Sequence, residues 1–300
     1  MSNLRSSLLP LALTASTLAL AACDGAAHAS RAPAHASTGE SAGAGASARS
    51  VTHRGRATRG AGTTPSTAPA VVARRVPTPD HPLRVLLVGD SVAGSLSPGL
   101  AHALAGTGAR FEDRTYPGFG LTATSPGFLD DGTPWPSRFQ EWPSVIDRTV
   151  RTFDPDVVIA YLGNWDALDR VAFGRRIRAL SPEWAQWYHD VLDLYARDLT
   201  ARGAHLYWVR LTRDVRPEQQ RVNDAINRQF DLLAQRMPDR VTILSVDGAI
   251  VPNGPYVQQQ HLPDGRSVDV WKLLHLTPEG ADLAGRAVVH DLAATWGLPR

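Results

Sequence analysis

The stretch from Val85 to Ser91 constrains the fold of this chain more than any other. Four apolar residues, Val85–Val88, run into a Gly-Asp-Ser corner at Gly89–Ser91, and a helical pattern follows over 93–105. An apolar run of this length bounded by glycine is typical of a buried strand. The corner therefore places the Ser91 hydroxyl where ligands collect in open α/β sheets, beside helix N–H groups that suit an oxyanion. Ser91 is a candidate nucleophile; a serine that merely caps the helix is the alternative.

Strand and helix patterns alternate along the rest of the chain. We expect further strands over 110–116, 156–162, 205–211 and 240–246. We expect further helices over 143–152, from Pro182 to Gly203, over 217–237, and from Pro278 onward. Such alternation predicts an α/β fold, a three-layer α/β/α sandwich with a central parallel sheet. Long loops interrupt it over 122–143 and from 247 to His275.

Composition divides the 300 residues into three parts. Residues 1–22 carry an apolar stretch that is too short for a comfortable membrane span, which predicts a signal peptide. Residues 23–80 are rich in Ala, Ser, Gly, Thr and Pro with scattered arginines, which predicts a flexible tether. Residues 81–300 are long enough for one α/β domain with its own core.

The apolar stretch ends in Leu20–Cys23, which resembles a bacterial lipobox. The resemblance implies a lipoprotein whose lipidated Cys23 anchors it to the extracytoplasmic face of the bacterial cell membrane. An ordinary secretory signal with an incidental cysteine is the alternative. Cys23 is the only cysteine, so an intramolecular disulfide and a cysteine-based metal site are excluded.

Charge and composition exclude other classes of partner. The formal net charge is only +2, and no basic patch is interleaved with aromatic residues, so we expect no nucleic-acid partner. No His-x-x-x-His cluster is present and the acidic residues do not group at ligand spacing, so we expect no metal site. No cofactor is implied.

Four motifs follow one another in order along the predicted domain. Gly89–Ser91 follows the first strand, a glycine loop at Pro117–Leu121 follows the second, Gly163–Asp166 follows the third, and His275 precedes the last helix. In this order they resemble the SGNH (GDS-type) hydrolases, over residues 83–298. The resemblance implies a flavodoxin-like SGNH hydrolase fold.

Two of these motifs show a narrower likeness. Residues 89–96 and 163–170 resemble the SGNH domains attached to bacterial membrane acyltransferases, which modify cell-surface sugars with O-acyl groups. This likeness implies an acyl-group chemistry at a cell surface.

The resemblance also assigns chemical roles. A serine hydroxyl is a poor nucleophile until a base removes its proton. The resemblance implies that His275 is the base for Ser91. The oxyanion donors it implies are the N–H of Ser91, the N–H of Gly120 or Gly118, and the amide of Asn164. Trp165 holds the family's usual asparagine place, so Asn164, one residue earlier, has turn formation as its alternative role.

A second departure concerns the catalytic acid. The family's aspartate usually stands three residues before the histidine, and here that residue is Lys272, which cannot accept the imidazole N–H. We assign Asp269 to this role, with Asp264 or a backbone carbonyl as alternatives. A Ser–His dyad or an inactive site is the remaining possibility, because the acid mainly fixes the tautomer of the imidazole.

These observations predict a surface-anchored serine esterase or acyltransferase that forms an acyl-enzyme. Its expected partner is an acylated, most simply O-acetylated, cell-wall or surface polysaccharide, or a small ester. Trp135 and Trp142 would stack on a sugar ring or pack a lid onto the domain. A catalytically weak or inactive carbohydrate-binding lipoprotein is the second hypothesis, favoured by Lys272. A lipase is the third, and it predicts a large apolar pocket.

Overall fold

The computed structural model describes residues 77–129, 131–137, 139–250, 258–272 and 274–299. These residues all belong to one compact unit of the chain, Pro65–Arg300. The predicted signal peptide, the lipidation site at Cys23 and nearly all of the predicted tether lie outside the described residues and remain predictions.

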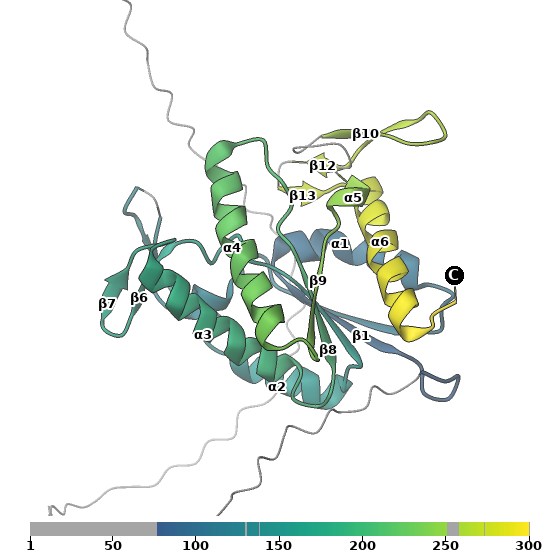
Figure 1. The fold of residues 1–300 in the computed structure, drawn as a ribbon, viewed down its shortest axis with the longest axis horizontal. Helices are drawn as coiled ribbons and strands as arrows, with labels where there is room; N and C mark the ends of the chain where they lie inside the picture. The colour runs from purple at the N-terminus through teal and green to yellow at the C-terminus, as the bar shows by residue number, and fades with distance from the viewer. Residues whose placement is uncertain (1–76, 130, 138, 251–257, 273, 300) are drawn as a thin grey trace, which may run out of the picture. The chain divides into compact units, whose positions relative to one another are not determined.

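A five-stranded parallel sheet forms the centre of this unit (Figure 1). In spatial order its strands are β2 (Arg110–Thr115), β1 (Arg84–Gly89), β5 (Val157–Tyr161), β8 (His205–Val209) and β9 (Val241–Leu244). β5 and β8 are buried at every residue, because helices cover the sheet on both faces. The order is that of the flavodoxin-like doubly wound sheet and confirms the predicted α/β class. Its topological switch point lies between β1 and β5.

Helices flank the sheet in two groups. They are α1 (Ser91–Leu104), α2 (Trp142–Phe153), α3 (Pro182–Leu199), α4 (Pro217–Arg236), the short α5 (Asp247–Ile250) and α6 (Pro278–Trp296). α1 packs against α6, whereas α3 packs against α2 and α4 (Figure 1). Ser181 and Thr277 cap α3 and α6, each just before a proline, as the sequence predicts. Within the described ranges no helix combines the length and apolar character of a membrane span.

Two predicted loops contain short strands that the sequence analysis missed. The first contains the 3-10 turn η1 (Leu121–Thr124), β3 (Gly127–Phe128) and β4 (Pro134–Trp135). A second sheet pairs these strands with β6 (Asp169–Ala172) and β7 (Arg175–Ile177), in the antiparallel order β4-β3-β6-β7. The other loop forms two hairpins, β10 (Gln259–His261) with β11 (Ser267–Asp269) and β12 (Trp271–Lys272) with β13 (His275–Leu276). Strands this short carry too little alternation to be recognised.

Glycines bring α1 and α6 into close contact. A Cβ atom on Gly99 would lie 2.0 Å from the Ala281 carbonyl oxygen, and one on Gly285 would lie 2.4 Å from the Gly99 carbonyl carbon. The backbones therefore touch directly. β13 leads into α6 and is hydrogen-bonded to α1: the Leu276 N–H donates to Ser95 Oγ at 3.1 Å.

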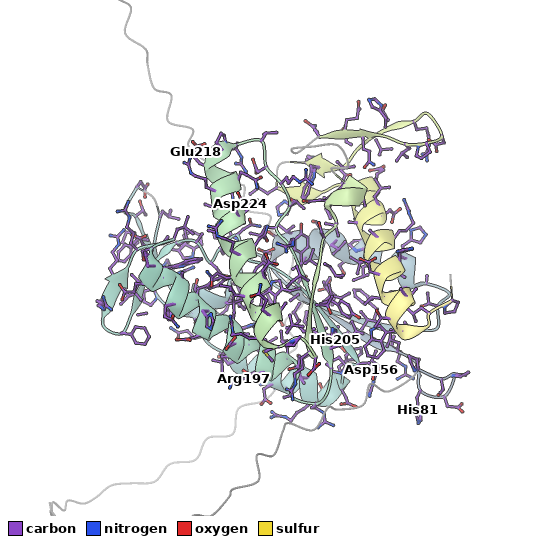
Figure 2. All side chains as sticks on the ribbon, viewed as in Figure 1. His81, Asp156, Arg197, His205, Glu218 and Asp224 are labelled. Carbon is purple, nitrogen blue, oxygen red and sulfur yellow. The ribbon has the colours of Figure 1, made fainter. Side chains whose placement is uncertain are left out.

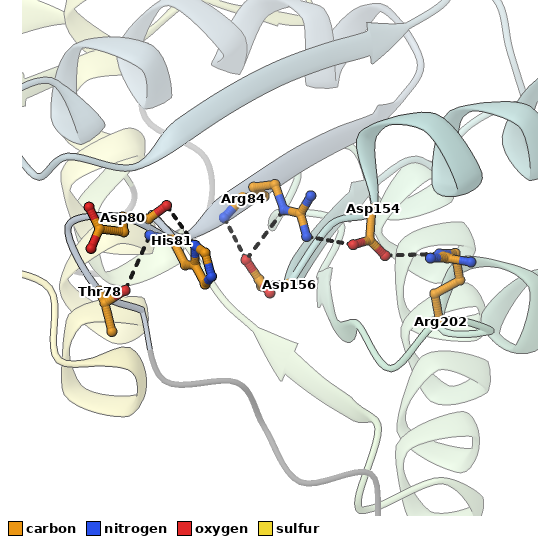
Figure 3. A network of polar contacts seen from close by, with 7 residues as sticks. All are labelled: Thr78, Asp80, His81, Arg84, Asp154, Asp156 and Arg202. Atoms are coloured by element: carbon orange, nitrogen blue, oxygen red, sulfur yellow. Dashed lines mark hydrogen bonds and ion pairs between the residues drawn. The ribbon is translucent and has the colours of Figure 1, made fainter.

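A polar network holds the amino ends of β1 and β5 (Figure 3). The Arg84 N–H donates to Asp156 Oδ2 at 2.8 Å, and the Arg84 guanidinium donates to Asp154 at 2.5 Å. Arg202 reaches the same Asp154 carboxylate at 2.8 Å, and these two guanidinium groups lower its pKa. Asp156 and His205 are labelled near this end of the sheet in Figure 2, whereas Ser91 lies at the carboxyl end of β1. The network therefore fixes the sheet without entering the candidate site.

Replacing Gly99 with alanine tests the helix contact. The added methyl group has no room, so Gly99→Ala should lower the free energy of unfolding by roughly 1–3 kcal/mol or more, despite the better helix propensity of alanine. The matched control is Gly248→Ala in α5, where an added Cβ meets no atom within 4 Å. Thermal unfolding of both variants decides the point, and equal melting temperatures would show that α1 and α6 do not touch as described.

Candidate active site

The structure brings together Ser91 and His275, which stand 184 positions apart in the sequence. Ser91 is the first residue of α1, directly past the end of β1, and His275 opens β13. The distance from His275 Nε2 to Ser91 Oγ is 2.9 Å. At this distance the imidazole can accept the hydroxyl proton. The geometry is that of a nucleophile with its base.

The first turn of α1 offers a backbone donor beside the hydroxyl. Asp90 caps the helix, and its Oδ1 accepts the N–H of Val92 at 2.8 Å. The Ser91 N–H has no hydrogen-bond partner within the described part of the chain. A helix N-terminus presents such N–H groups to negative charge, so this one can receive an oxyanion.

Asp90 itself is fully buried next to the nucleophile. Its Oδ2 has no hydrogen-bond partner among the described residues. Burial raises the pKa of this carboxyl to about 7, and the nearby Asp166 carboxylate raises it further against the lowering effect of the helix N–H groups. A carboxyl that is largely neutral below this pH puts no full negative charge where an oxyanion would form.

A buried network around Asp166 joins η1, which directly follows the glycine loop, to the turn after β5. Asp166 Oδ1 accepts from the N–H and hydroxyl of Thr122 at 2.8 and 3.0 Å, and its Oδ2 accepts from the Tyr188 hydroxyl at 3.0 Å. Arg170, also fully buried, donates to Thr122 Oγ1 and to the Trp165 carbonyl. Burial raises the pKa of Asp166, and the Arg170 charge opposes that rise.

Asp166 and Arg170 both fall within the motif at 163–170, but the sequence assigned neither of them a role. The available signal was a carboxylate and a guanidinium four residues apart, directly after a strand that the sequence predicts to be buried. These two residues position the loops that carry Asn164 and Gly120.

The predicted oxyanion donors lie in different places. Asn164 lines the same cavity as Ser91 and His275. Gly120 is not among the residues that line it. A Cβ on Gly120 would lie 2.7 Å from Asp166 Oδ1 and 2.9 Å from the Trp165 Cβ, so this position needs a glycine for packing. Its part in holding an oxyanion remains a prediction.

The cavity beside Ser91 has a volume of about 270 Å³. Its walls come from the β1–α1 corner, the turn after β5, the segment from the end of β8 into α4, and the β12–β13 hairpin. The lining residues are Asp90, Ser91, Val92, Tyr161, Asn164, Trp165, Leu168, Leu211, Thr212, Arg213, Asp214, Arg216, Gln219, Asn223, Trp271, Leu274 and His275. Most of the wall near α4 is polar or charged.

The tryptophans of the first long loop do not face this cavity. Trp135 and Trp142 are 8% and 3% exposed, and neither lines it. The expectation that they stack on a sugar ring is therefore wrong, and the alternative, packing onto the domain, describes them. Trp135 instead stacks on Trp165 with ring centroids 5.2 Å apart, and Trp165 forms part of the cavity wall.

No carboxylate contacts His275 within the described residues. The Asp269 carboxylate lies near Gln259, at 3.4 Å, while its backbone carbonyl accepts from Thr277. Asp264 pairs with Arg266. Lys272 is the cross-strand neighbour of His275 in the β12–β13 hairpin. The described site is a Ser–His dyad, and the assignment of Asp269 as the acid has no contact to support it.

Within the described ranges, no group of three or more His, Cys, Asp or Glu side chains is placed to hold a metal ion.

The raised pKa of Asp90 predicts how stability depends on pH. The folded state keeps the proton up to about pH 7, whereas the unfolded chain loses it near 3.8. Between these values the folded state binds more protons, so wild-type stability should fall as pH rises, by up to about 4 kcal/mol. Asp90→Asn keeps a capping side chain and should remove this fall.

Urea unfolding of both proteins from pH 4 to pH 8 measures this difference. Parallel stability curves for wild type and Asp90→Asn would contradict the assignment of a buried, neutral carboxyl.

Comparisons with solved structures return proteins of low sequence identity. A lipase/acylhydrolase from Enterococcus faecalis is 15% identical over 73% of this chain and 99% of its own, with a TM-score of 0.46. The lipopolysaccharide acetyltransferase periplasmic domain of Salmonella ser. Paratyphi A is 14% identical over 70% and 84%, with a TM-score of 0.45. The peptidoglycan O-acetyltransferase A C-terminal catalytic domain of Streptococcus pneumoniae is 15% identical over 73% and 97%, with a TM-score of 0.42.

These sequence identities and TM-scores are too low to support a conclusion about function. No curated protein sequence matches the chain. The family described as "Protein of unknown function (DUF459)" matches residues 84–291, from the first residue of β1 into α6, and the chain belongs to this family.

Proposed function

We propose that this protein is a serine esterase or acyltransferase that works through an acyl-enzyme on Ser91. The observation that carries the proposal is the 2.9 Å contact between Ser91 Oγ and His275 Nε2 at the carboxyl edge of the parallel sheet. The unpartnered Ser91 N–H at the start of α1 supports it, as does Asn164 in the same cavity.

The reaction follows from these groups. Ser91 Oγ attacks the ester carbonyl carbon while His275 Nε2 takes the hydroxyl proton. The oxyanion is held by the Ser91 N–H and the Asn164 amide. Collapse of the tetrahedral intermediate breaks the bond to the alcohol, which leaves with the proton from His275. Water in a hydrolase, or a sugar hydroxyl in a transferase, then attacks the acyl-serine and regenerates the hydroxyl.

The cavity favours a short acyl group on a polar alcohol. Its volume of about 270 Å³ lies below the usual range of drug-sized sites, roughly 300–1,000 Å³. Arg213, Arg216 and Gln219 line one wall, which suits hydroxyl-rich ligands. The small volume does not fit the large apolar pocket that a lipase requires. An O-acetylated cell-wall or surface polysaccharide, met by a protein anchored through Cys23, is the substrate we propose.

A binding protein without turnover is the second candidate. It is favoured by one observation, the lysine beside His275 where the related hydrolases carry their acid. Without an acid the imidazolium is less stabilised, which lowers the rate more readily than it abolishes it. We therefore expect slow turnover rather than none.

Removal of either dyad residue is the direct test of the proposal. Ser91→Ala and His275→Ala should each lower p-nitrophenyl acetate turnover by about 10³-fold or more, and Ser91→Ala should also abolish labelling by a fluorophosphonate. His290→Ala, an exposed histidine on α6, is the control that should retain full activity. Turnover or labelling that survives in Ser91→Ala would refute the enzyme, whereas saturable polysaccharide binding without turnover would select the binding protein.

The role of Asp269 can be tested separately. Because its carboxylate does not contact His275, Asp269→Asn should leave kcat/KM unchanged. A loss of about 10-fold or more with an unchanged melting temperature would show that Asp269 does act through the imidazole, as in a full triad.

A further inference from the structure

The hairpin formed by β6 and β7 carries the most exposed large apolar side chain of the described residues. Phe173, at its tip, is 79% exposed. The hairpin belongs to the small antiparallel sheet, at the outer side of the molecule in Figure 1. Single exposed apolar side chains are common on protein surfaces, so exposure alone does not indicate a function. What distinguishes Phe173 is that its exposure is combined with an unusual backbone conformation.

The backbone at the tip makes this choice of residue more unusual. Ala172 pairs with Arg175, so the turn consists of Phe173 and Gly174 alone. Both have positive φ, 53° and 73°, as a type I′ turn requires. Asn or Gly is the usual first residue of this turn, and a bulky side chain with positive φ is strained. Asparagine or glycine would avoid both the backbone strain and the exposed apolar surface. A strained, exposed phenylalanine at this position therefore indicates a functional role.

Arginines surround the ring. Arg175, Arg176 and Arg178 are all exposed and lie within five residues of Phe173. Glu183 pairs with Arg175 and Asp169 pairs with Arg176, while Arg178 has no ion pair among the described residues. The tip therefore combines an apolar ring with one guanidinium group that no carboxylate in the described part of the chain neutralises, and this combination suits the interface of an anionic bilayer.

The base of the hairpin is rigid. The Arg176 guanidinium lies 4.2 Å from the centroid of the Phe128 ring on β3. β6 also contains the buried Arg170, whose guanidinium donates to the Trp165 carbonyl in the cavity wall. The hairpin thus holds a fixed orientation relative to the cavity, and little ordering entropy is lost when the tip inserts.

We propose that the Phe173 tip inserts into the headgroup region of an anionic lipid bilayer and orients the domain on the membrane. A membrane suits the tip better than a second copy of the chain or a protein pocket, because a single convex ring offers too little area for a stable protein interface. The proposal is independent of the chemistry assigned to Ser91. The expected lipid anchor at Cys23 would keep the domain near such a surface.

Site-specific labelling tests insertion at this position. The full chain with Cys23→Ser has no other cysteine, so Phe173→Cys can carry a single environment-sensitive fluorophore. The matched control is Leu194→Cys on α3, which is 55% exposed with ordinary helical backbone. Each fluorophore reports only on its own surroundings. Binding of the N-terminal segment to the vesicle would therefore affect both labelled proteins alike and leaves the comparison between residues 173 and 194 valid.

On phosphatidylcholine–phosphatidylglycerol vesicles the label at residue 173 should brighten, shift to the blue, and be quenched by lipid-borne nitroxides, while the label at residue 194 should not. Arg178→Glu should weaken the response at residue 173 by about fivefold or more, because each basic group near an anionic surface contributes to binding. Equal responses at the two positions, or an equal response on pure phosphatidylcholine, would overturn the proposal.

A stability measurement separates insertion from a structural role. Asparagine tolerates positive φ, so Phe173→Asn should raise the melting temperature by about 2–4 °C. A lower melting temperature would show that the ring is needed for packing and would contradict a role at the membrane.

Discussion

The direct backbone contact between α1 and α6 is the constraint on which the candidate site depends. Ser91 begins α1, and His275 stands three residues before α6, so the distance between their side chains is set by how these helices meet. Gly99 and Gly285 let the helices touch. The hydrogen bond from Leu276 to Ser95 then fixes the strand that carries the imidazole. A hydrogen-bonded dyad follows from helix packing distant from the reacting atoms.

The second constraint is electrostatic. Asp166 and Arg170 are both fully buried, which is costly unless each charge is compensated. Thr122, Tyr188 and the Trp165 carbonyl complete their hydrogen bonding, so the network is satisfied as a unit. Its members come from η1, the turn after β5, β6 and α3. The same arginine thereby connects the wall of the cavity with the hairpin that carries Phe173.

The central sheet was predictable because its strands are apolar runs of ordinary length bounded by clear signals. Ser181 and Thr277 mark helix starts through well-known capping chemistry. Ser91 and His275 could be paired only through a family resemblance, since spacing alone does not show which histidine folds back to β1. The structure then places them in contact.

The features that sequence reasoning missed depend on tertiary context. The strands β6 and β7 are short and rich in arginine, so they show no recognisable periodicity; they become strands by pairing with each other and, for β6, with β3. Tryptophans in a long loop suggest a surface for stacking on a ligand, but Trp135 and Trp142 are buried and pack against the domain. Asp269 seemed the nearest substitute for the missing acid, yet the β12–β13 hairpin places Lys272 opposite His275 instead. Cross-strand register cannot be read from distance along the chain.

The central claim is that Ser91 receives an acyl group from an ester with the help of His275. The most direct measurement mixes the full chain with an activated acetyl ester, quenches it at short times, and locates any added acetyl group by peptide mass spectrometry. The account predicts one acetyl group on the peptide that contains Ser91, decaying with time, and none in the His275→Ala protein. An unmodified Ser91 peptide at every time, or acetylation at another residue alone, would contradict it.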